Sequence, residues 1–366
     1  MHVLVTGGTG FVGAHTVAAL LQAGHTVRLL VRSPHKLEPA LGPLRLRPGE
    51  VETSRGEATD PAALRTAARG CDAAVHAAAV FSLNPRDAAR IRATNVRATE
   101  VVLQEALEAG CDPVVYVSST VAVFPRECGG RLSADSPPYD GPRPPGEYIR
   151  SKAESEQVAR RHQAAGAPVV CTYPGQVVGP HDPAVGENTR RLVWTLRGLF
   201  PLVAPGRVWV SDVRDVAALH VALLTPGRGP RRYVAPGHDL SLREQAQLLG
   251  RLTGRHLPAL EVPARLLLPF ARALGAAQRP LKGHYPADAE GAWLCTRAPQ
   301  VDARPATQEL GVAPRPVEES FADTVRWLYA QGRISRRQAG RLAMQGEAPR
   351  PRARLRRPGP RAPLQA

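Results

Sequence analysis

The chain has 366 residues, 43% of them hydrophobic, which is enough for one large α/β domain with a smaller appendage. It contains no uncharged apolar stretch of about 18 residues and no charged leader before an apolar block, so we expect a cytoplasmic protein without a membrane span. The five cysteines are widely spaced without a Cys-x-x-Cys pair and the eleven histidines form no ligand pair, which argues against a disulfide framework and a metal site.

A glycine-rich turn joins the first predicted strand, residues 3–5, to an amphipathic helix over residues 14–23. The turn reads Thr6-Gly7-Gly8-Thr9-Gly10-Phe11-Val12-Gly13. Gly7 allows a tight turn, Gly10 lets the backbone approach a pyrophosphate, and Gly13 lets the helix pack on the strand. Free N–H groups at the positive end of the helix attract the anion. The order of strand, turn and helix therefore predicts a dinucleotide site.

The end of the second predicted strand, residues 26–31, bears on the choice of dinucleotide. An acidic residue there accepts hydrogen bonds from the adenosine ribose and repels a 2′-phosphate, whereas an arginine does the reverse. Here Arg32 and Lys36 follow the strand, and the first acid is Glu38. This pattern favours NADP(H) and leaves NAD(H) as the alternative. An arginine that is merely solvated is the other interpretation of Arg32.

Strand-like and helix-like segments alternate along the first 180 residues, as in a parallel sheet covered by helices. Further strands are expected at residues 73–77, 114–118 and 169–173, and helices at residues 61–68, 85–109 and 147–165. We therefore predict an α/β fold with a Rossmann-type, doubly wound parallel sheet.

Tyr148 and Lys152 lie four residues apart on the helix predicted at 147–165 and so share one face of it. A free phenol has a pKa of about 10, so a tyrosine base near neutral pH needs a shift of roughly 3 units, or about 4 kcal/mol. A neighbouring ammonium would stabilise the phenolate. Only three of the 48 basic residues are lysines, which makes a chance match less plausible. An ordinary contact between helix neighbours is the competing interpretation.

After Gly179 the alternation loosens. We expect helices at residues 189–198, 240–253, 263–277 and 316–330, with the chain returning to the sheet at 208–210 and 232–234. The predicted organisation is a Rossmann domain over 1–180, completed by about 207–235, and a smaller, interleaved, mostly helical substrate region over 181–206 and 236–345. The apolar stripe at 263–277 is either a roof over an apolar pocket or ordinary core packing. It comprises Leu266, Leu267, Leu268, Phe270 and Leu274.

The net charge of +16 is concentrated at the end of the chain. From Arg333 onward there are ten arginines and one acid, Glu347, so this segment carries +9. Residues 346–366 are rich in proline, alanine and arginine and hold no aromatic residue for base stacking. We expect a disordered, solvated tail and no nucleic-acid partner.

Taken together, the motifs resemble those of the extended short-chain dehydrogenase/reductase family over residues 1 to about 330. That family includes the NAD-dependent epimerase/dehydratases, the 3β-hydroxysteroid dehydrogenases and the dihydroflavonol reductases. Besides the glycine turn, the matching residues are His76-Ala77-Ala78-Ala79, Asn95, Ser118-Ser119-Thr120, Tyr148 with Lys152, Tyr173-Pro174-Gly175 to Gly179-Pro180, and Asp215-Val216-Ala217.

The resemblance implies an NAD(P)-dependent oxidoreductase in which Tyr148 is the acid/base and Lys152 also holds the nicotinamide ribose. By register Thr120 orients the substrate oxygen, with Ser119 the second choice, and Asn95 anchors a water in the proton path. Glu57 stands where the family usually has an Asp on the adenine side. The implied cofactor contacts are Gly7, Thr9, Gly10, Phe11, Val12, Arg32, Lys36, Glu57, Ala77, Ala78, Tyr148, Lys152, Pro174 and Val177.

Two departures from the family's sugar-nucleotide epimerases bear on the substrate. Those enzymes commonly carry an Arg where this chain has Tyr173 and a Tyr-Gly where it has Phe124-Pro125. Both departures favour a small hydrophobic alcohol, ketone or aldehyde. A nucleotide-sugar epimerase or dehydratase is the alternative enzyme, and a non-catalytic cofactor-sensing protein is the alternative from another class. A homodimer is left open as the assembly.

Overall fold

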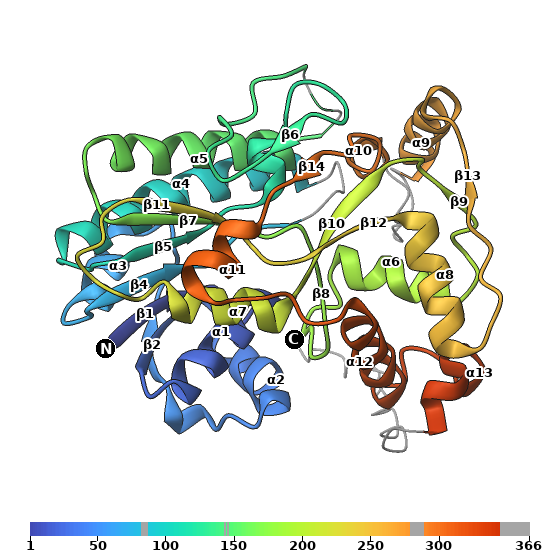
Figure 1. Ribbon diagram of the computed structural model, residues 1–366. Coiled ribbons are helices and arrows are strands. Elements are labelled where there is room, and N and C mark those ends of the chain that lie inside the picture. Colours follow the sequence, from blue (N-terminus) through green and yellow to red (C-terminus); the bar gives the residue numbers. More distant parts are fainter. Residues whose placement is uncertain (82–86, 143, 145, 279–288, 345–366) are drawn as a thin grey trace, which may run out of the picture.

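The computed structural model describes residues 1–81, 87–142, 144, 146–278 and 289–344 (Figure 1). Within this part of the chain the centre is a seven-stranded sheet in the order β11-β7-β5-β4-β1-β2-β3, with every neighbouring pair parallel. The strands are β1 (His2–Thr6), β2 (Thr26–Val31), β3 (Glu52–Arg55), β4 (Ala73–His76), β5 (Val114–Val117), β7 (Val169–Tyr173) and β11 (Arg231–Val234). The predicted doubly wound α/β fold is confirmed.

Burial explains which strands the sequence predicted. Strands β4, β5 and β7 are buried along their whole length and consist mostly of apolar residues, as expected for parallel strands covered on both faces. Strand β3 was not predicted. Its four residues, Glu-Thr-Ser-Arg, are polar and largely exposed because the strand forms the edge of the sheet.

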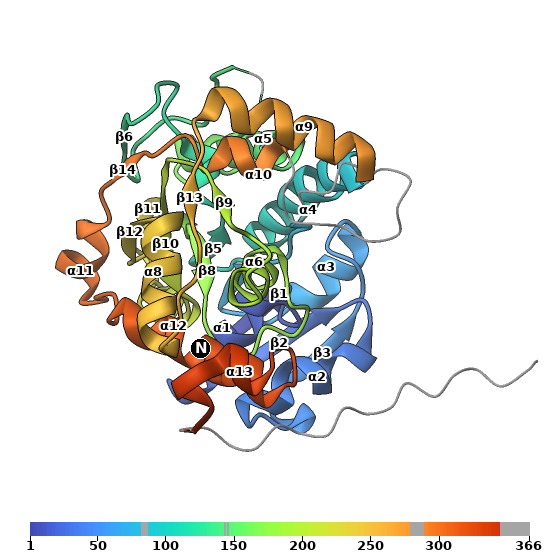
Figure 2. The same ribbon diagram turned by 90° about the vertical axis from the view of Figure 1, so that its right-hand side faces the viewer.

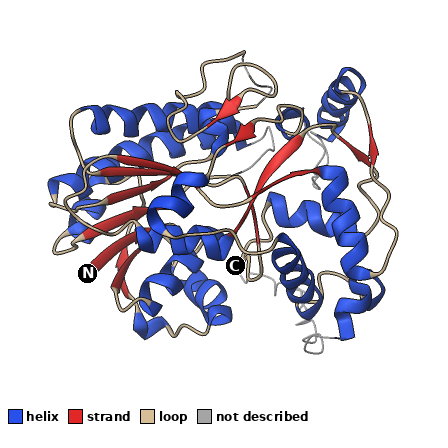
Figure 3. Ribbon diagram, viewed as in Figure 1, coloured by secondary structure: helices blue, strands red, loops and turns tan. Residues whose placement is uncertain are grey.

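Two helical layers cover the sheet (Figures 1 and 3). One layer contains α3 (Pro61–Ala68), α4 (Ala88–Glu108) and α5 (Tyr148–Ala164). The other contains α1 (Phe11–Gln22), α2 (Leu37–Leu41), α7 (Val213–Ala222) and α11 (Arg304–Leu310). Each layer shares an apolar core with one face of the sheet. The helix predicted from residue 85 is α4, and the start of that prediction lies outside the described residues.

A second, three-stranded sheet corrects one prediction. Strand β10 (Arg207–Asp212) lies between β8 (Gln176–Val178) and β12 (His238–Ser241), so the strand expected at 208–210 does not return to the central sheet. Two glycines allow this pairing: a Cβ would lie 2.1 Å from the Trp209 carbonyl oxygen at Gly175 and 2.4 Å from the Val210 carbonyl oxygen at Gly237. Strand β11, expected at 232–234, does complete the central sheet.

The remaining helices belong to the C-terminal region (Figure 2). Helices α6 (Glu187–Leu196), α8 (Leu242–Thr253) and α12 (Val317–Ala330) share a core with residues around α13 (Arg336–Ala339). Helices α9 (Ala264–Gln278) and α10 (Ala289–Leu294) contact each other above them. Two short parallel pairs join β9 (Leu202–Val203) to β13 (Leu260–Glu261) and β6 (Arg131–Leu132) to β14 (Gln300–Val301). None of the described helices is long and apolar enough to cross a membrane. The tail predicted at 346–366 lies outside the described residues.

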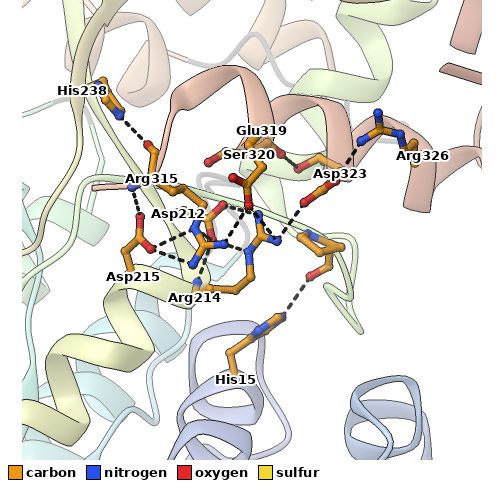
Figure 4. Close-up of polar contacts among 12 residues, drawn as sticks. His15, Asp212, Arg214, Asp215, His238, Arg315, Glu319, Ser320, Asp323 and Arg326 are labelled. Atoms are coloured by element: carbon orange, nitrogen blue, oxygen red, sulfur yellow. Dashed lines mark hydrogen bonds and ion pairs between the residues drawn. The ribbon is translucent and has the colours of Figure 1, made fainter. Parts of the chain in front are cut away.

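An ion-pair network fixes the C-terminal region to the central domain (Figure 4). Arg315, which precedes α12, donates from its backbone N–H and from Nε to the Asp215 carboxylate of α7, both at 2.9 Å. Arg214 of α7 bonds to Asp323 of α12 at 2.8 Å and to Asp212 at 2.9 Å. Although burial opposes it, the hydrogen bonds from Arg214 hold the pKa of Asp212 below its ordinary value. These contacts hold the C-terminal region in a fixed position against the central domain.

Candidate active site

A cavity of about 400 Å³ lies where strands β1, β4 and β5 end. The central domain lines it with the turns after these strands, including Gly10, Ala77 and Ser118. The C-terminal region lines it with residues of α6, β10 and α10, such as Trp209 and Leu294. Doubly wound folds bind their ligands at this edge of the sheet.

The apolar stripe of α9 does not form the roof that the sequence suggested. Among the described residues, the apolar roof comes from α10 through Leu294, while Leu266 and Phe270 of α9 are 60% and 53% exposed. Of the two interpretations that the sequence left open for this stripe, the pocket roof is therefore excluded for its described residues.

The glycine-rich turn is shaped to hold a phosphate group. Gly7 has a φ of +77°, and a Cβ there would lie 2.5 Å from the Ala78 nitrogen; at Gly13 it would lie 2.1 Å from the Gly7 carbonyl oxygen. Helix α1 begins after Gly10 and, within the described chain, has no side-chain cap and no acid in its first turn. Gly10, Phe11 and Val12 line the cavity, so the positive helix end faces it. This arrangement fits the pyrophosphate of a dinucleotide.

The other predicted cofactor contacts fall into two groups. Ala77, Pro174 and Val177 line the cavity, and Thr9 and Ala78 lie in or against the turn beside it. Arg32, Lys36 and Glu57 are exposed and stand apart from the cavity lining, just beyond the ends of β2 and β3. The two strand ends are adjacent because the Gly56 N–H donates to the Val31 carbonyl at 3.1 Å.

Tyr148 and Lys152 both line the cavity and are 8% and 4% exposed. Burial raises the pKa of the Tyr148 phenol, and its hydrogen bond with the Ser119 hydroxyl opposes that shift. Burial lowers the pKa of Lys152 to about 8, against the attraction of the Glu156 carboxylate. The Lys152 ammonium donates to the Val117 carbonyl at 3.1 Å and lies 5.6 Å from the centre of the Tyr116 ring.

Of the two hydroxyls considered at the end of β5, Ser119 is the one that contacts the tyrosine. Ser119 caps a short 3₁₀ turn, Thr120–Val123, its hydroxyl donates to the Pro174 carbonyl at 3.4 Å, and it is the hydroxyl that lowers the pKa of the Tyr148 phenol. Thr120 lines the cavity too, and its backbone N–H donates to the Pro174 carbonyl at 3.0 Å.

Asn95 lies on α4 beside the site, and its side chain is occupied by protein groups. Its Oδ1 accepts from the Val80 N–H at 2.7 Å, and its Nδ2 donates to the Val80 carbonyl and to Ser151 Oγ, both at 3.1 Å. Ser151 in turn donates to the Tyr148 carbonyl at 2.8 Å. In this arrangement Asn95 connects the segment after β4 to the start of α5.

Two residues that the sequence analysis missed support the tyrosine. Glu290 of α10 accepts from the Ile149 N–H at 3.0 Å, and its negative charge adds to the raised pKa of Tyr148. The Phe81 ring lies 4.7 Å from the Tyr148 ring, centre to centre. Glu290 is 141 residues beyond Ile149, and no local pattern marks it.

A buried carboxylate lies one helical turn beyond Lys152. Glu156 accepts from Ser118 at 2.8 Å and from Tyr173 and Arg160 at 2.7 Å each. Tyr173 therefore points into the core. Of the two departures from sugar-nucleotide epimerases, Phe124 alone lines the cavity among the described residues.

The fold and the site together define a Rossmann-type enzyme that binds a nicotinamide dinucleotide. The model of the NAD dependent epimerase/dehydratase family matches residues 3–235. The chain is 32% identical over 337 residues to the putative dihydroflavonol 4-reductase of Synechocystis sp., covering 90% of this chain and 95% of that protein. It is 29% identical to sterol demethylase protein B of Methylococcus capsulatus, covering 91% and 100%.

A solved structure agrees with these relatives. The dTDP-glucose 4,6-dehydratase DesIV of Streptomyces venezuelae, crystallised with NAD, is 25% identical and superposes with a TM-score of 0.69 over 92% of this chain and 99% of its own. The chain thus belongs to the NAD dependent epimerase/dehydratase family, within the extended short-chain dehydrogenases/reductases, and is an NAD(P)-dependent oxidoreductase.

Proposed function

We propose that this protein transfers a hydride between NADP(H) and a hydrophobic alcohol, ketone or aldehyde, with Tyr148 as the acid/base. The observation that carries the proposal is the placement of Tyr148 and Lys152, both buried, in the same cavity as the uncapped start of α1. When bound, the nicotinamide supplies or accepts the hydride. Lys152 holds the nicotinamide ribose in this proposal.

The side chains account for the proton. In the reductive direction Tyr148 donates its phenolic proton to the carbonyl oxygen of the substrate, and in the oxidative direction it takes the proton from the alcohol. Burial opposes the phenolate. In the proposed mechanism the positive charge of Lys152, four residues away on the same face of the helix, favours it. The Ser119 hydroxyl, which lowers the pKa of the phenol, holds the same substrate oxygen in this mechanism.

Apolar side chains around the reacting groups support the substrate class. Phe81, Phe124 and Leu294 line the cavity together with Val208 and Trp209. Such a lining favours a hydrocarbon body over a strongly hydrated one. The name of the Synechocystis relative, a putative reductase of dihydroflavonols, points to the same class.

The preference for NADP(H) rests on Arg32 and Lys36. Both side chains are exposed beyond the end of β2, next to the glycine turn that follows β1, and β1 and β2 are neighbours in the sheet. Two cations there favour a 2′-phosphate on the adenosine ribose.

Replacing Tyr148 by Phe tests the acid/base role. A panel of hydrophobic ketones and aldehydes, assayed with both cofactors by nicotinamide absorbance, identifies a substrate for the comparison. We expect Tyr148→Phe to lower turnover by roughly 10²- to 10⁴-fold, the usual contribution of general acid–base catalysis, while cofactor binding persists. Tyr233→Phe is the matched control, since Tyr233 is buried elsewhere and bonds to Glu309. Near-normal turnover of Tyr148→Phe would show that Tyr148 is not the acid/base.

A further inference from the structure

Helix α6 contributes two charged residues to the wall of the cavity, the buried Glu187 and the half-buried Arg191, and each has a buried side-chain atom without a hydrogen-bond partner in the described part of the chain. We propose that Glu187 and Arg191 bind a hydroxyl group on the substrate, so that the substrate is amphipathic, with an apolar body and a neutral, hydroxylated end. This inference rests on the proposed function, because it describes the substrate that Tyr148 acts on.

Each of these residues has one buried side-chain atom that the described protein leaves without a partner. Glu187 is 9% exposed; its Oε1 accepts from Arg190 at 3.3 Å, whereas its buried Oε2 has no partner in the described part of the chain. Arg191 donates from Nη1 to the Cys295 sulfur at 3.7 Å, a weak acceptor, and its buried Nη2 likewise lacks a partner among the described residues. Both residues line the cavity.

The other charged groups contributed by this wall are satisfied by the protein. Asp182 accepts from the Ala184 and Gly186 N–H groups and from Thr189 Oγ1, at 3.1, 2.8 and 2.6 Å. Arg207 pairs with Asp239 at 2.7 Å and with Glu244 at 3.1 Å. Buried polar atoms in folded proteins nearly always have partners. Among the described charged residues that line the cavity, Glu187 and Arg191 are the two with a buried atom that lacks a partner, and a ligand in the cavity is the partner we infer for them.

The pair of open atoms selects the chemistry of the ligand. Glu187 and Arg191 are one helical turn apart, and within the described residues no ion pair joins them. One offers an acceptor and the other a donor. A hydroxyl group both donates and accepts, so it satisfies both. A carboxylate or phosphate would pair with Arg191 but would stand beside the open Glu187 oxygen, and an ammonium would meet the reverse conflict.

Three matched series of linear methyl ketones test the proposal: one ending in a methyl group, one in a hydroxyl and one in a carboxylate, each over a range of chain lengths. Each is assayed in two ways, by the shift in melting temperature of the NADP⁺-saturated protein and by kcat/KM for reduction with NADPH. We expect the best hydroxyl-ended ketone to exceed its methyl-ended counterpart by about 10- to 100-fold, the range for a hydrogen bond to a charged group.

Substitutions on α6 should erase this preference. Arg191→Met should bring hydroxyl-ended and methyl-ended ketones to within a few-fold of each other. Glu187→Gln, which keeps the shape of the side chain, should reduce the preference in part and guards against misfolding of the first variant. Arg243→Met, an exposed arginine on α8, is the control and should retain the full preference.

The outcomes separate this inference from the proposed function. Selective stabilisation by hydroxyl-ended ketones that Arg191→Met abolishes supports the inference even if no ketone is reduced, in which case the hydride-transfer proposal fails alone. Reduction with no gain from the hydroxyl overturns the inference and leaves the proposed function intact. A preference for the carboxylate series that is lost in Arg191→Met overturns it in favour of an anion site, and no binding by any series overturns it as well.

Discussion

Tyr148 lies where its charged form is disfavoured, although oxidation of an alcohol requires that form. Burial and the Glu290 carboxylate both raise its pKa, and the bond from Ser119 acts against them. Lys152 has a pKa of about 8, so it keeps most of its positive charge at neutral pH. The pKa of this phenol therefore depends on burial and on two neighbours from different parts of the chain, Ser119 and Glu290.

Ser119 and Thr120 provide a test of which hydroxyl acts with the phenol. Because Ser119 lowers the pKa of the Tyr148 phenol, we expect Ser119→Ala to lower turnover by about 10- to 100-fold, as for the loss of a hydrogen bond to a charged group. Thr120→Val should have a smaller effect on turnover. The measurement is kcat and kcat/KM on a common substrate. A larger loss in Thr120→Val would restore the assignment made from sequence register.

Arg32 is the second residue with a distinct expected outcome. A contact with the 2′-phosphate should bind NADPH about 10- to 100-fold more tightly than NADH. The melting temperature should then rise more with NADPH at equal concentration. Arg32→Asp should abolish or invert this order, while Arg69→Asp, an exposed arginine beyond α3, should not. Equal shifts from both cofactors in the unmodified protein would overturn the preference.

Site residues could be predicted from the sequence where the residues that form one feature lie close together in the chain. The glycine turn needs glycines within a few positions of one another, and Tyr148 and Lys152 share one helix, so a linear pattern reveals both. Glu187 and Arg191 are also close in sequence, but their open atoms depend on which neighbours pair with them. That information exists only in the folded structure.

Among the elements, the N-terminus of α5 is held by a residue of the C-terminal region. The Glu290 carboxylate of α10 accepts from the Ile149 N–H and lies close enough to Tyr148 to raise its pKa. Helix α10, which lines the cavity, thus also positions the helix that carries Tyr148 and Lys152. This coupling gives the third prediction.

Glu290→Gln keeps an acceptor for the Ile149 N–H but removes the negative charge. We expect the pKa of Tyr148 to fall, so that the limb of the pH profile for alcohol oxidation that rises with pH moves to lower pH. The readout is kcat/KM against pH, with Glu309→Gln on α11 as the control. An unchanged profile or a shift to higher pH would contradict the role given to Glu290.

Elements with an apolar or periodic pattern could be predicted, and the others could not. Helix α3 and strands β2 and β7 have the bounds that the sequence predicted, because hydrophobic periodicity sets them. Strand β3 is polar and exposed. Strand β10 was recognised as a strand but placed in the wrong sheet, since its partner depends on close backbone approach at Gly175 and Gly237.

Across the whole molecule, three buried histidines make stability depend on pH. Burial lowers the pKa of His15 to about 4 and that of His76 and His220 to about 3, from 6.5. His15 donates to the Pro180 carbonyl at 3.0 Å, and His220 bonds to Thr16 at 2.8 Å. These contacts connect α1 to the chain after β8 and to α7.

The sign of the effect follows from where each histidine binds its proton. Above pH 6.5 these histidines are mostly neutral in both the folded and the unfolded chain, so they do not lower the free energy of unfolding there. Between pH 6.5 and about 4 the unfolded chain takes up protons that the folded chain does not, and the free energy of unfolding should fall by up to about 4 kcal/mol per pH unit for three groups. Denaturant unfolding against pH measures this, and His220→Gln should flatten the slope by about a third. A slope unchanged in His220→Gln would contradict the account.

The placement of β11 has a consequence for how the chain is made. Strand β7, buried along its length and mostly apolar, ends at Tyr173, and the strand that covers its free edge ends at Val234. At the usual synthesis rate of about 5–20 residues per second, roughly 60 residues must follow before that edge can be paired. For some seconds the nascent chain therefore exposes the unpaired edge of β7, which is prone to aggregation. Chaperone dependence and losses during expression should therefore be set more by the segment between β7 and β11, which builds the substrate wall, than by the dinucleotide-binding half. That half leaves the ribosome first.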